Sequence, residues 1–537
     1  MTIDPQLRFD YVIVGAGTAG CVLAARLSQD PRVRVCLIEA GGPARHAFIQ
    51  VPALVGPAIM HRSLTWGLTT EPQTALNQRR LPLPRGKVIG GSGSINGMAY
   101  HRGHPKDYDD WAAAGNLGWS WQEVLPYFRL SENNADRHDS HVHGVDGPIH
   151  VTFIPKPNRL NQAFCDAFAA LGGYPSCDDF TGLDPEGYGL RQGTIHRGIR
   201  DSSARAMLRP ALSRPNLTVL TRSAVTSIRI EGGRATGVDV AAADGARWIS
   251  ASREVLLCAG AVHSPQLLML SGVGPARHLE SLGVRVKADL PGVGANYHDH
   301  PAVIVALDMR DTTSYGLSWR TLPRALWNLG EYALARSGPL ASNVFESTAF
   351  IRSAAGADRP DIQIAFQPAR RNPHAFPLPL GHGFAMSVVN LYPRSRGDVR
   401  LASSDPRAAP RVNPNVLAEP KDSEPLLRGL HLARQLCDTA AFAPYGATEV
   451  RPGRGLTSDA QLLAYLREAT ATVHHPVGSC RMGIDPLAVV DADLRVRGIE
   501  SLRVVDAAVF PGIVGGNTNA PVVMVAEKAA ASIMAQS

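Results

Sequence analysis

The chain has 537 residues, a formal net charge of +7 and a composition that is 45% hydrophobic and 19% charged. This length is too great for one compact core, so we expect two large lobes, and no uninterrupted apolar run is long enough to predict a membrane span. The positive charge comes from scattered arginines without a basic run, which argues against nucleic-acid binding.

The first predicted elements are a buried parallel strand at Tyr11–Val14, the glycine-rich segment Gly15–Gly20 and a helix over Thr18–Gln29. In this GxGxxG pattern the first glycine permits a tight turn, the second lets the backbone approach a pyrophosphate, and the third lets the helix pack on the strand. The phosphates then face the N-terminus of the helix, where backbone N–H groups are free to bind them.

The next predicted strand, Val33–Ile38, ends at Glu39. A carboxylate at this place can accept hydrogen bonds from both ribose hydroxyls of an adenosine, and it would repel a 2′-phosphate. Strand, glycines, helix and acid in this order therefore predict a site for FAD or NAD(H) in preference to NADP(H).

A change of pattern follows in the middle of the chain. Period-two alternation from Leu217 to Ser250 predicts a short antiparallel meander. A strand at Glu254–Cys258 and a helical stretch at Pro265–Leu270 then indicate a return to the nucleotide-binding domain. Further strands, such as Asp361–Phe366 and Met386–Leu391, have no intervening helical pattern and favour an antiparallel sheet.

Two helices, Glu424–Ala440 and Ala460–Ala469, follow these strands. We therefore assign residues 303–470 to a second domain. A strand at Leu502–Val505 and a helix at Pro521–Met534 close the chain.

Four further segments carry motifs. Gly86–Met98 reads GKVIGGSGSINGM, Gly260–Gly274 reads GAVHSPQLLMLSGVG, His474–Gly483 reads HHPVGSCRMG, and Val504–Pro521 reads VVDAAVFPGIVGGNTNAP. With the N-terminal fingerprint, these segments resemble in order and spacing those of the glucose-methanol-choline (GMC) family of FAD-dependent oxidoreductases. The resemblance covers nearly the whole chain and is greatest to the bacterial choline dehydrogenase and primary alcohol dehydrogenase branch.

The resemblance implies a two-domain α/β (α+β) fold, in which a Rossmann-type FAD-binding domain accompanies a substrate domain built on an antiparallel sheet. The FAD-binding domain would span residues 1–302, with some segments capping the substrate site, and the substrate domain residues 303–470. Residues 471–537 would return to the FAD domain and carry the catalytic residues. Some family members bind flavin covalently through a histidine, but the matching residue here is Ile95, so we expect noncovalent FAD.

The fingerprint and the resemblance together predict a set of FAD contacts. Among them, Asn96 can hydrogen-bond a heteroaromatic edge of the flavin. The full set is Gly15, Gly17, Thr18, Ala19, Gly20, Glu39, Ala40, Trp66, Val88, Gly91, Asn96, Gly97, Met98, Ala99, Val225, Ala259, His474, Asp506, Ala507, Asn517 and Thr518.

His475 is the residue expected to act as catalytic base. Hydride transfer from an alcohol carbon to flavin N5 needs a base for the hydroxyl proton, and imidazole titrates at about pH 6.5. Pro476 biases His475 to an extended conformation, in which His474 would point to the opposite side. In the family the histidine of this HPVG segment is the base. Its usual partner matches Asn517, whose amide can hydrogen-bond the substrate oxygen.

Other histidines are candidates for metal ligands by their spacing. His298 and His300 form an HxH pattern, and His138, His141 and His143 form a cluster. Neither set is joined by further ligands at known metal-site spacing, and the segment similar to the first set is a structural turn in the family. We therefore expect no metal site.

The sequence thus predicts a flavoenzyme that oxidises a primary alcohol to an aldehyde and passes electrons to an unnamed acceptor: oxygen, a quinone or another carrier. Three alternatives stay open. One is an oxidase that uses oxygen, and a second is a non-redox lyase or photochemical decarboxylase on the same scaffold. The third is a flavin-binding protein with a structural role, against which the intact pair His475 and Asn517 argues.

A medium aliphatic or aromatic alcohol is the favoured substrate, because the second domain supplies aromatic surface. The aromatic residues are Trp319, Trp327, Tyr332 and Phe345, while Glu331 and Glu346 leave a choline-like cation open. Seven cysteines without a CxxC pair, and a first apolar stretch that is the nucleotide-binding strand, favour an intracellular protein without a signal peptide. We expect a cytoplasmic location or peripheral contact with the inner membrane, and the oligomeric state is left open.

Overall fold

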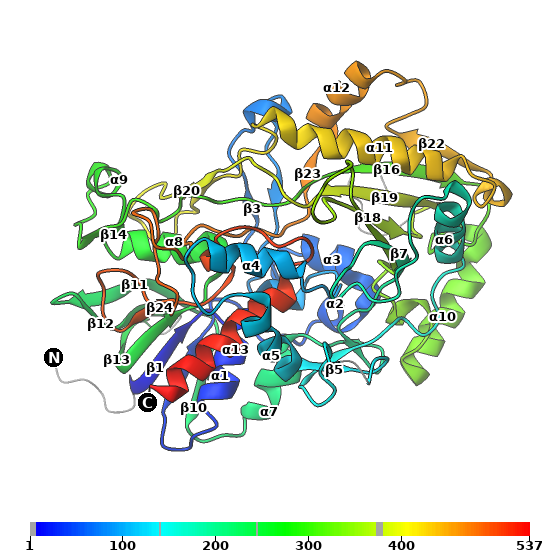
Figure 1. Cartoon of the computed structure of the whole chain (residues 1–537). Coiled ribbons are helices and arrows are strands. Elements are labelled where there is room, and N and C mark those ends of the chain that lie inside the picture. Colours follow the sequence, from blue (N-terminus) through cyan, green and yellow to red (C-terminus); the bar gives the residue numbers. More distant parts are fainter. Residues whose placement is uncertain (1–6, 139–140, 243–244, 372–379, 537) are drawn as a thin grey trace.

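The computed structural model describes residues 7–138, 141–242, 245–371 and 380–536. Two large sheets organise the chain, one at the lower left and the other at the upper right in Figure 1. Both sheets draw strands from distant parts of the sequence, so each lobe is assembled from several segments of the chain.

The first sheet has the strand order β10-β2-β1-β13-β12-β11. β1 (Arg8–Val14) lies between β2 (Val35–Ile38) and β13 (Gly245–Leu257), and β10 (Leu217–Leu220) pairs with β2, all in parallel. β24 (Leu502–Val504) is also parallel to β13. These strands are nearly continuous apolar runs, as a sheet needs when both of its faces are covered.

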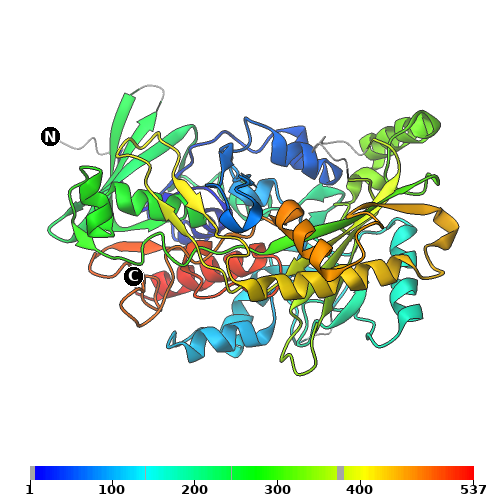
Figure 2. The same cartoon turned by 90° about the horizontal axis from the view of Figure 1, so that it is seen from above.

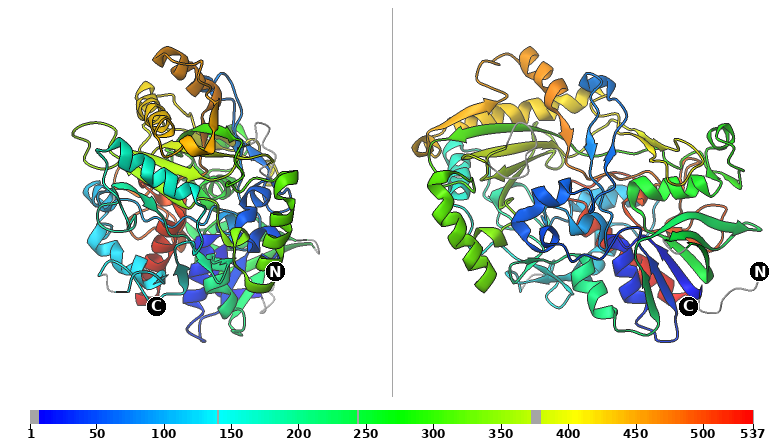
Figure 3. Two further views of the ribbon diagram at one scale, coloured as in Figure 1. Left: turned by 90° about the vertical axis from the view of Figure 1, so that its right-hand side faces the viewer. Right: turned by 180° about the vertical axis from the view of Figure 1, so that it is seen from behind.

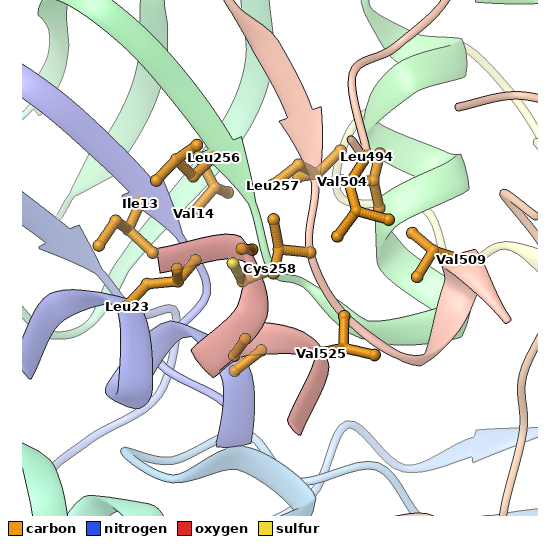
Figure 4. Packing of buried hydrophobic residues seen from close by; sticks show 14 of the residues in the cluster. Ile13, Val14, Leu23, Leu256, Leu257, Cys258, Leu494, Val504, Val509 and Val525 are labelled. Atoms are coloured by element: carbon orange, nitrogen blue, oxygen red, sulfur yellow. The ribbon is translucent and has the colours of Figure 1, made fainter. Parts of the chain in front are cut away.

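Two helices from opposite ends of the chain pack beside this sheet. α1 (Thr18–Leu27), in blue, and α13 (Asn519–Ala535), in red, lie next to each other in Figures 1 and 3. Arg26 of α1 and Glu527 of α13 form an ion pair with two hydrogen bonds of 2.8 Å. Figure 4 shows the shared core, including Ile13, Val14, Leu23, Leu256, Leu257, Val504 and Val525.

The predicted elements of this lobe are largely confirmed, with three differences. The antiparallel meander, predicted from Leu217, is present only from Ser223, as β11 (Ser223–Glu231), β12 (Arg234–Ala242) and β13, because Leu217–Leu220 forms β10 and pairs in parallel with β2. The strand predicted at Glu254–Cys258, however, is the second half of β13, because one half of that strand pairs antiparallel with β12 and the other half parallel with β1. The following helix, α8, begins at Gly260 and not at Pro265.

The second sheet is antiparallel, as predicted, with the order β22-β16-β19-β18-β17-β7. Its strands are β7 (Gly187–Leu190), β16 (Pro301–Met309), β17 (Ser347–Ile351), β18 (Ile362–Gln367), β19 (Gly383–Asn390) and β22 (Ala447–Arg451), and β23 (Ala471–Thr472) pairs with β16. Two strands of this sheet, β7 and β23, lie outside residues 303–470. The domain boundaries at 302 and 470 therefore stay a prediction.

Two helices cover the outer face of this sheet. α6 (Leu160–Leu171) and α11 (Ser423–Cys437) bury their apolar sides on it, and α11 runs along the sheet in Figure 2. Leu430 of α11, for example, belongs to one buried cluster with Phe384 and Val388 of β19. The opposite face of the sheet is left free to form the wall of a cavity.

The remaining elements are short or peripheral. The helices are α2 (Ala47–Gln50), α3 (Val55–Met60), α4 (Pro105–Ala113), α5 (Trp121–Ser131), α7 (Arg209–Ala211), α8 (Gly260–Leu270), α9 (Ala276–Ser281), α10 (Leu322–Ala335) and α12 (Asp459–Ala469); the strands are β3 (Leu68–Thr69), β4 (Pro82–Leu83), β5 (Glu132–Asn134), β6 (Ile149–Val151), β8 (Ile195–His196), β9 (Ile199–Arg200), β14 (Val273–Gly274), β15 (Ala288–Asp289), β20 (Asp398–Arg400) and β21 (Arg411–Asn413). Within the described ranges, no helix has the length and apolar character needed to cross a membrane.

Candidate active site

A cavity of about 2300 Å³ is lined by residues of both lobes. The end of β1 and the start of α1 contribute Val14 and Thr18, while β18 and β19 contribute Gln363 and Ser387. The cavity therefore extends from the nucleotide-binding fingerprint to the inner face of the antiparallel sheet.

The glycines of the two glycine-rich segments form the floor of its nucleotide half. Gly15 has φ +97°, and a Cβ there would lie 2.7 Å from the carbonyl oxygen of Cys258. A Cβ at Gly91 would lie 2.8 Å from Cα of Gly17, so the two segments touch backbone to backbone. Only glycine fits at these points. The resulting cradle at the N-terminus of α1 fits the pyrophosphate of a dinucleotide.

Glu39 lies at the adenosine end of this cradle. Its side chain is buried, and its two carboxylate oxygens accept hydrogen bonds from the N–H groups of Ala16 (3.0 Å) and Gly41 (2.7 Å). Burial raises the pKa of this carboxyl to about 7, against the lowering effect of the two N–H groups. Glu39 lines the cavity, so its remaining lone pairs face the place of a ribose.

Most of the predicted FAD contacts line this cavity. They are Gly15, Gly17, Thr18, Ala19, Glu39, Ala40, Trp66, Gly91, Asn96, Gly97, Met98, Ala99, Val225, Ala259, His474, Asp506, Ala507, Asn517 and Thr518. Gly20 and Val88 do not line it. A Cβ at Gly20 would lie 2.0 Å from the carbonyl oxygen of Gly15, so this glycine serves helix packing, and Val88 is buried in a separate apolar cluster.

The loop that carries Asn96 is held by a residue that the sequence analysis missed. Arg200, at the end of β9, is fully enclosed and donates from Nη1 to the backbone oxygen (2.6 Å) and to Oδ1 (2.7 Å) of Asn96. The same Oδ1 accepts from the N–H of Met98. With its oxygen engaged, Asn96 keeps its amide N–H₂ for a ligand. Ile95 also lines the cavity, and its side chain has no atom that bonds to flavin.

His475 and Asn517 meet in the wall of the cavity. Nε2 of His475 and Nδ2 of Asn517 are 3.0 Å apart, although the residues come from different loops. Asn517 follows Gly515 and Gly516, and Gly515 fits closely against Tyr392, since a Cβ there would lie 2.1 Å from the tyrosine oxygen. The N–H of Gly515 also donates to the buried carboxylate of Asp107 (2.7 Å). Tertiary contacts therefore fix the position of Asn517.

The second ring nitrogen of His475 contacts His300. The two Nδ1 atoms are 3.0 Å apart and the rings are nearly perpendicular, at 88°. From its likeness to a structural turn of the family, the HxH segment of His298 and His300 was expected to have no role beside His475, and the contact of His300 corrects this expectation. The sequence feature that could have pointed to His300 as a site residue is its place in the segment NYHDHP, which is rich in polar residues.

The backbone at His475 is held from two sides. Its N–H donates to Oδ1 of Asp299 (2.7 Å), and Arg85 donates to the carbonyl oxygen of His474 (2.8 Å). His474 itself has φ +66°, so the expected extended geometry at this residue is wrong. Left-handed backbone at His474 turns the chain and presents both imidazoles to the cavity, which each of them lines.

Burial dominates the electrostatics of these histidines. It holds the pKa of His475 well below 6.5, with a further lowering from the charge that His300 would add. It also lowers the pKa of His300 and His474, to about 4 and about 3. The sequence-based expectation of a base that titrates near pH 6.5 is therefore corrected. The ring of His475 is therefore neutral, which is the state a general base requires. Its two ring nitrogens contact His300 and Asn517.

Comparison with known proteins adds independent observations. A family model described as GMC oxidoreductase matches residues 9–302, and a second with the same description matches residues 393–526. An alcohol dehydrogenase [acceptor] of Pseudomonas putida is 40% identical over 532 residues, which are 98% of this chain and 96% of the relative. An oxygen-dependent choline dehydrogenase of Sinorhizobium fredii is 42% identical over 535 residues, with the same coverage of each chain.

Solved structures resemble the whole fold. Pyridoxine 4-oxidase from Mesorbium loti has a TM-score of 0.87 and 33% sequence identity, and the match covers 98% of this chain and 99% of that one. Formate oxidase from Aspergillus oryzae has a TM-score of 0.91 and 28% identity, with 98% of each chain covered.

Proposed function

The chain belongs to the GMC oxidoreductase family, and on this premise we propose that it is an FAD-dependent enzyme that oxidises the CH–OH group of a primary alcohol to an aldehyde. FAD, when bound, supplies a hydride acceptor at flavin N5. The observation that carries the proposal is the meeting of His475 Nε2 and Asn517 Nδ2 in a cavity that also holds the dinucleotide cradle. The names of the relatives, alcohol dehydrogenase and choline dehydrogenase, support an alcohol as the substrate.

His475 is the general base in this proposal. Its Nδ1 is engaged by His300, which leaves Nε2 as the nitrogen that faces Asn517 and the cavity. The proton of the substrate hydroxyl moves to this Nε2 while the carbon gives up its hydride. Because burial keeps the ring neutral, the base is available over the whole neutral range of pH.

Asn517 positions the substrate oxygen. The substrate hydroxyl takes the place of the direct 3.0 Å contact between the two residues: it donates to Nε2 of His475 and accepts from Nδ2 of Asn517. As the proton leaves, the amide N–H stabilises the negative charge that develops on the oxygen. Oδ1 of Asn517 has no hydrogen-bond partner within the described part of the chain, so the amide is free to serve a ligand.

We test the reaction with an anaerobic panel of primary alcohols, with flavin absorbance as the readout. Bleaching by simple alcohols is the expected result. An unchanged oxidised spectrum with every alcohol, together with light-dependent decarboxylation or alcohol-independent lyase activity, would replace this proposal with the non-redox alternative.

FAD is held noncovalently in this proposal, because Ile95 offers no nucleophile. Acid precipitation of the purified protein should release the yellow chromophore into the supernatant. Flavin that stays with the pellet would contradict the noncovalent mode.

The electron acceptor distinguishes a dehydrogenase from an oxidase. The relatives include both an acceptor-dependent dehydrogenase and an oxidase structure. After anaerobic reduction, mixing with a short-chain ubiquinone in one arm and with oxygen in the other compares the two rates of reoxidation. We propose the dehydrogenase mode, so faster reoxidation by the quinone is expected.

A cytoplasmic location is part of the same proposal. The seven cysteines are all free, and Cys21, Cys36, Cys258 and Cys480 are buried. Free thiols are typical of a reducing compartment. Fractionation of cells that express the tagged full chain tests the location, with recovery in the periplasm as the contrary result.

A further inference from the structure

The charges along the cavity wall are distributed unevenly. Its acidic residues within the described ranges, Glu39 and Asp506, both belong to the nucleotide half. Asp506 is already bound by the N–H groups of Gly260 and Ala508, both at 2.8 Å. The half formed by the second lobe has only cationic charges in the described part: Arg191, Arg324, Arg370, Arg371 and Arg451.

Arg191 is the arginine in this half that is buried without a counter-ion. Its side chain is 4% exposed, and Nε donates to the carbonyl oxygen of Phe345 (2.6 Å). Its guanidinium carbon lies 5.5 Å from the centre of the Phe345 ring. No carboxylate of the described residues pairs with it, whereas Arg370 is neutralised by Asp308 at 2.6 Å. Burial lowers the pKa of Arg191 only to about 9, so it stays charged at neutral pH.

A buried charge without a partner is costly, and natural proteins rarely retain one without a use. The planar guanidinium matches a carboxylate, which it can bind with two parallel hydrogen bonds. With Nε engaged by the protein, the terminal N–H groups of Arg191 are the ones that can receive an anion from the cavity.

Arg191 lies on the substrate side of the flavin loop. The Phe345 ring beneath it touches that loop, since a Cβ at Gly97 would lie 3.3 Å from the ring. The charge of Arg191 lowers the pKa of His101, and His101 is in turn close enough to lower that of His475. Arg191 thus lines the same cavity as His475 and Asn517 without being part of the proton-transfer pair.

The neighbouring wall is polar as well. Gln363, Gln367 and Ser387 project from the inner face of the sheet into the cavity and are otherwise buried. Gln363 donates to Thr348 (3.1 Å), and Gln367 donates to Ser387 (3.0 Å). Such a wall favours an oxygen-rich substrate over a plain hydrocarbon chain.

From these observations we propose that the alcohol substrate carries a carboxylate, which binds Arg191 while the hydroxyl lies between His475 and Asn517. This inference rests on the proposed alcohol oxidation and names its substrate class. The carboxylate is unchanged by the reaction, in which the CH–OH carbon loses a hydride and the oxygen a proton. A cationic alcohol of the choline type is disfavoured, because it would face Arg191 with a like charge.

The test compares substrates of one shape and different charge. Anaerobic stopped-flow reduction of the holoenzyme is measured with 4-(hydroxymethyl)benzoate, its methyl ester and benzyl alcohol, and in parallel with 6-hydroxyhexanoate and its methyl ester. In at least one series we expect the acid to exceed the ester in second-order rate constant by 10-fold or more. Raising the salt concentration should reduce this ratio only slightly, since the pair is buried.

Variants then assign the preference to one residue. Arg191→Met should bring the acid-to-ester ratio close to one, and Arg191→Lys should keep part of it. The matched control is Arg370→Met, which removes a cavity arginine that Asp308 already neutralises, and its ratio should stay that of the wild type. If Arg191→Met does not fold, inhibition of the wild type and of Arg191→Lys by benzoate and hexanoate supplies the comparison, with weaker inhibition of the variant expected.

The outcomes separate the two proposals. Reduction by esters as fast as by acids in both series overturns the carboxylate assignment and leaves the alcohol oxidation intact. A ratio that survives Arg191→Met overturns it too. The absence of reduction by every alcohol, whatever its charge, counts against the proposed function itself.

A second observation, independent of the first, concerns α10. The helix exposes Leu322, Leu326, Leu329 and Leu334 by 56 to 92%, together with Trp327 by 74% and the preceding Trp319 by 87%. Tyr332 is its single buried residue. The helix lies at the periphery of the molecule in Figures 1, 2 and 3.

Exposed apolar side chains gathered on one helix mark an interaction surface. Trp327 and Leu334 are seven positions apart and share one face of the helix, whereas Leu322, Leu326 and Leu329 share another face and also line the cavity. Arg320 precedes the helix and Arg336 follows it, and the helix has one acidic residue, Glu331, which Ser337 and Lys156 engage. Tryptophan, leucine and arginine in this arrangement are typical of helices that lie in the headgroup region of a bilayer.

The geometry points to α10 as a docking surface for an anionic lipid bilayer. The holoenzyme is sedimented with vesicles of phosphatidylcholine and phosphatidylglycerol at 3:1, and with phosphatidylcholine alone. We expect binding to the anionic vesicles, with at least a 10-fold loss in Trp327→Ser/Leu334→Ser. The matched control is Leu117→Ser, an exposed leucine between α4 and α5.

Sedimentation velocity on the same proteins measures their oligomeric state and so tests the alternative, in which a second copy of the chain covers α10. A wild-type dimer that the double variant converts to a monomer, without vesicle binding, would show that a second copy of the chain covers this face. That result, or equal vesicle binding by wild type and double variant, overturns the bilayer assignment.

Discussion

Nδ1 of His475 lies 3.0 Å from Nδ1 of His300, and the two rings stand at 88°. One hydrogen is shared by this contact, so the tautomers of the two rings are coupled. When the Asn517 amide donates to Nε2 of His475, the hydrogen of the His475 ring sits on Nδ1 and is donated to His300. Nε2 then carries the lone pair of the ring, and in the proposed mechanism this lone pair receives the substrate proton once the hydroxyl has displaced the amide.

Removal of the base is the first prediction. His475→Ala should lower the rate of anaerobic flavin reduction by about 10² to 10⁴ while FAD stays bound. Because burial holds the pKa of His475 well below 6.5, the wild-type rate should be flat above about pH 6.5. Stopped-flow rates across pH 6 to 9 measure both effects. His474→Ala is the control and should cost less; the reverse order would refute the assignment of the base.

His300→Ala tests the coupled tautomers. We expect a loss of about 10 to 10² in the reduction rate, the usual range for a residue that orients an active group. Added imidazole should restore part of the rate, because it can replace the hydrogen-bonding group of His300. A variant that had lost only packing would not regain its rate in this way. A wild-type rate in His300→Ala would show that His475 keeps its reactive tautomer unaided.

Asn517→Ala removes the donor to the substrate oxygen. The reduction rate should fall by about 10 to 10³, as for the loss of one oxyanion-type hydrogen bond. The pH profile should keep its wild-type shape, since no titrating group has been changed. Measured rates over the same pH range decide this, and a new inflection would imply that Asn517 controls the protonation of His475.

Glu39→Ala should weaken FAD binding. Loss of the acceptor for the ribose hydroxyls should cost roughly 2 to 4 kcal/mol, because a hydrogen bond to a charged group contributes about 1.5 to 3 kcal/mol. The variant should purify largely without flavin. Equilibrium titration of the apoprotein with FAD gives the dissociation constant. Glu39→Gln, which keeps one acceptor, is the matched control. Its dissociation constant for FAD should lie between those of the wild type and Glu39→Ala.

Acid should destabilise the protein below pH 6.5. Burial lowers the pKa of several histidines in the folded state: His101, His298 and His474 to about 3, and His263 and His300 to about 4. Between these values and 6.5 the unfolded chain binds more protons, so stability falls as the pH falls. Each neutral histidine contributes about 1.4 kcal/mol of loss per pH unit.

Five buried acids act in the opposite direction. The pKa of Asp107 and of Asp299 is raised to about 6 and that of Glu39 to about 7, and burial also raises the pKa of Asp506 and of Glu527. The ten histidines with a lowered pKa outnumber these acids, so the net slope keeps its sign. Urea unfolding of the holoenzyme at pH 5 and pH 7 measures it. Equal midpoints at the two pH values would contradict the prediction, and His298→Asn should make the difference smaller.

Much of the site followed from local signals in the sequence. Gly15, Gly17 and Gly91 act through their own backbone, and a pattern of glycines reports such a constraint directly. His475 and Asn517 could be named as the proposed catalytic pair because each lies in a motif, and the structure brings them to 3.0 Å from each other. The FAD contact of Val88 stays a prediction, because this residue packs in an apolar cluster and does not line the cavity.

The sequence by itself determined the elements and the cofactor class, because strand periodicity, glycine turns and the acid after a strand are encoded within a few neighbouring residues. Only the tertiary structure decided which side chains meet. His300 and His475 are 175 positions apart, Arg200 and Asn96 are 104, and Arg191 reaches Phe345 over 154. Contacts of this range, and the burial that sets the pKa of each histidine, arise from the packing of the two lobes and leave no periodic trace in the chain.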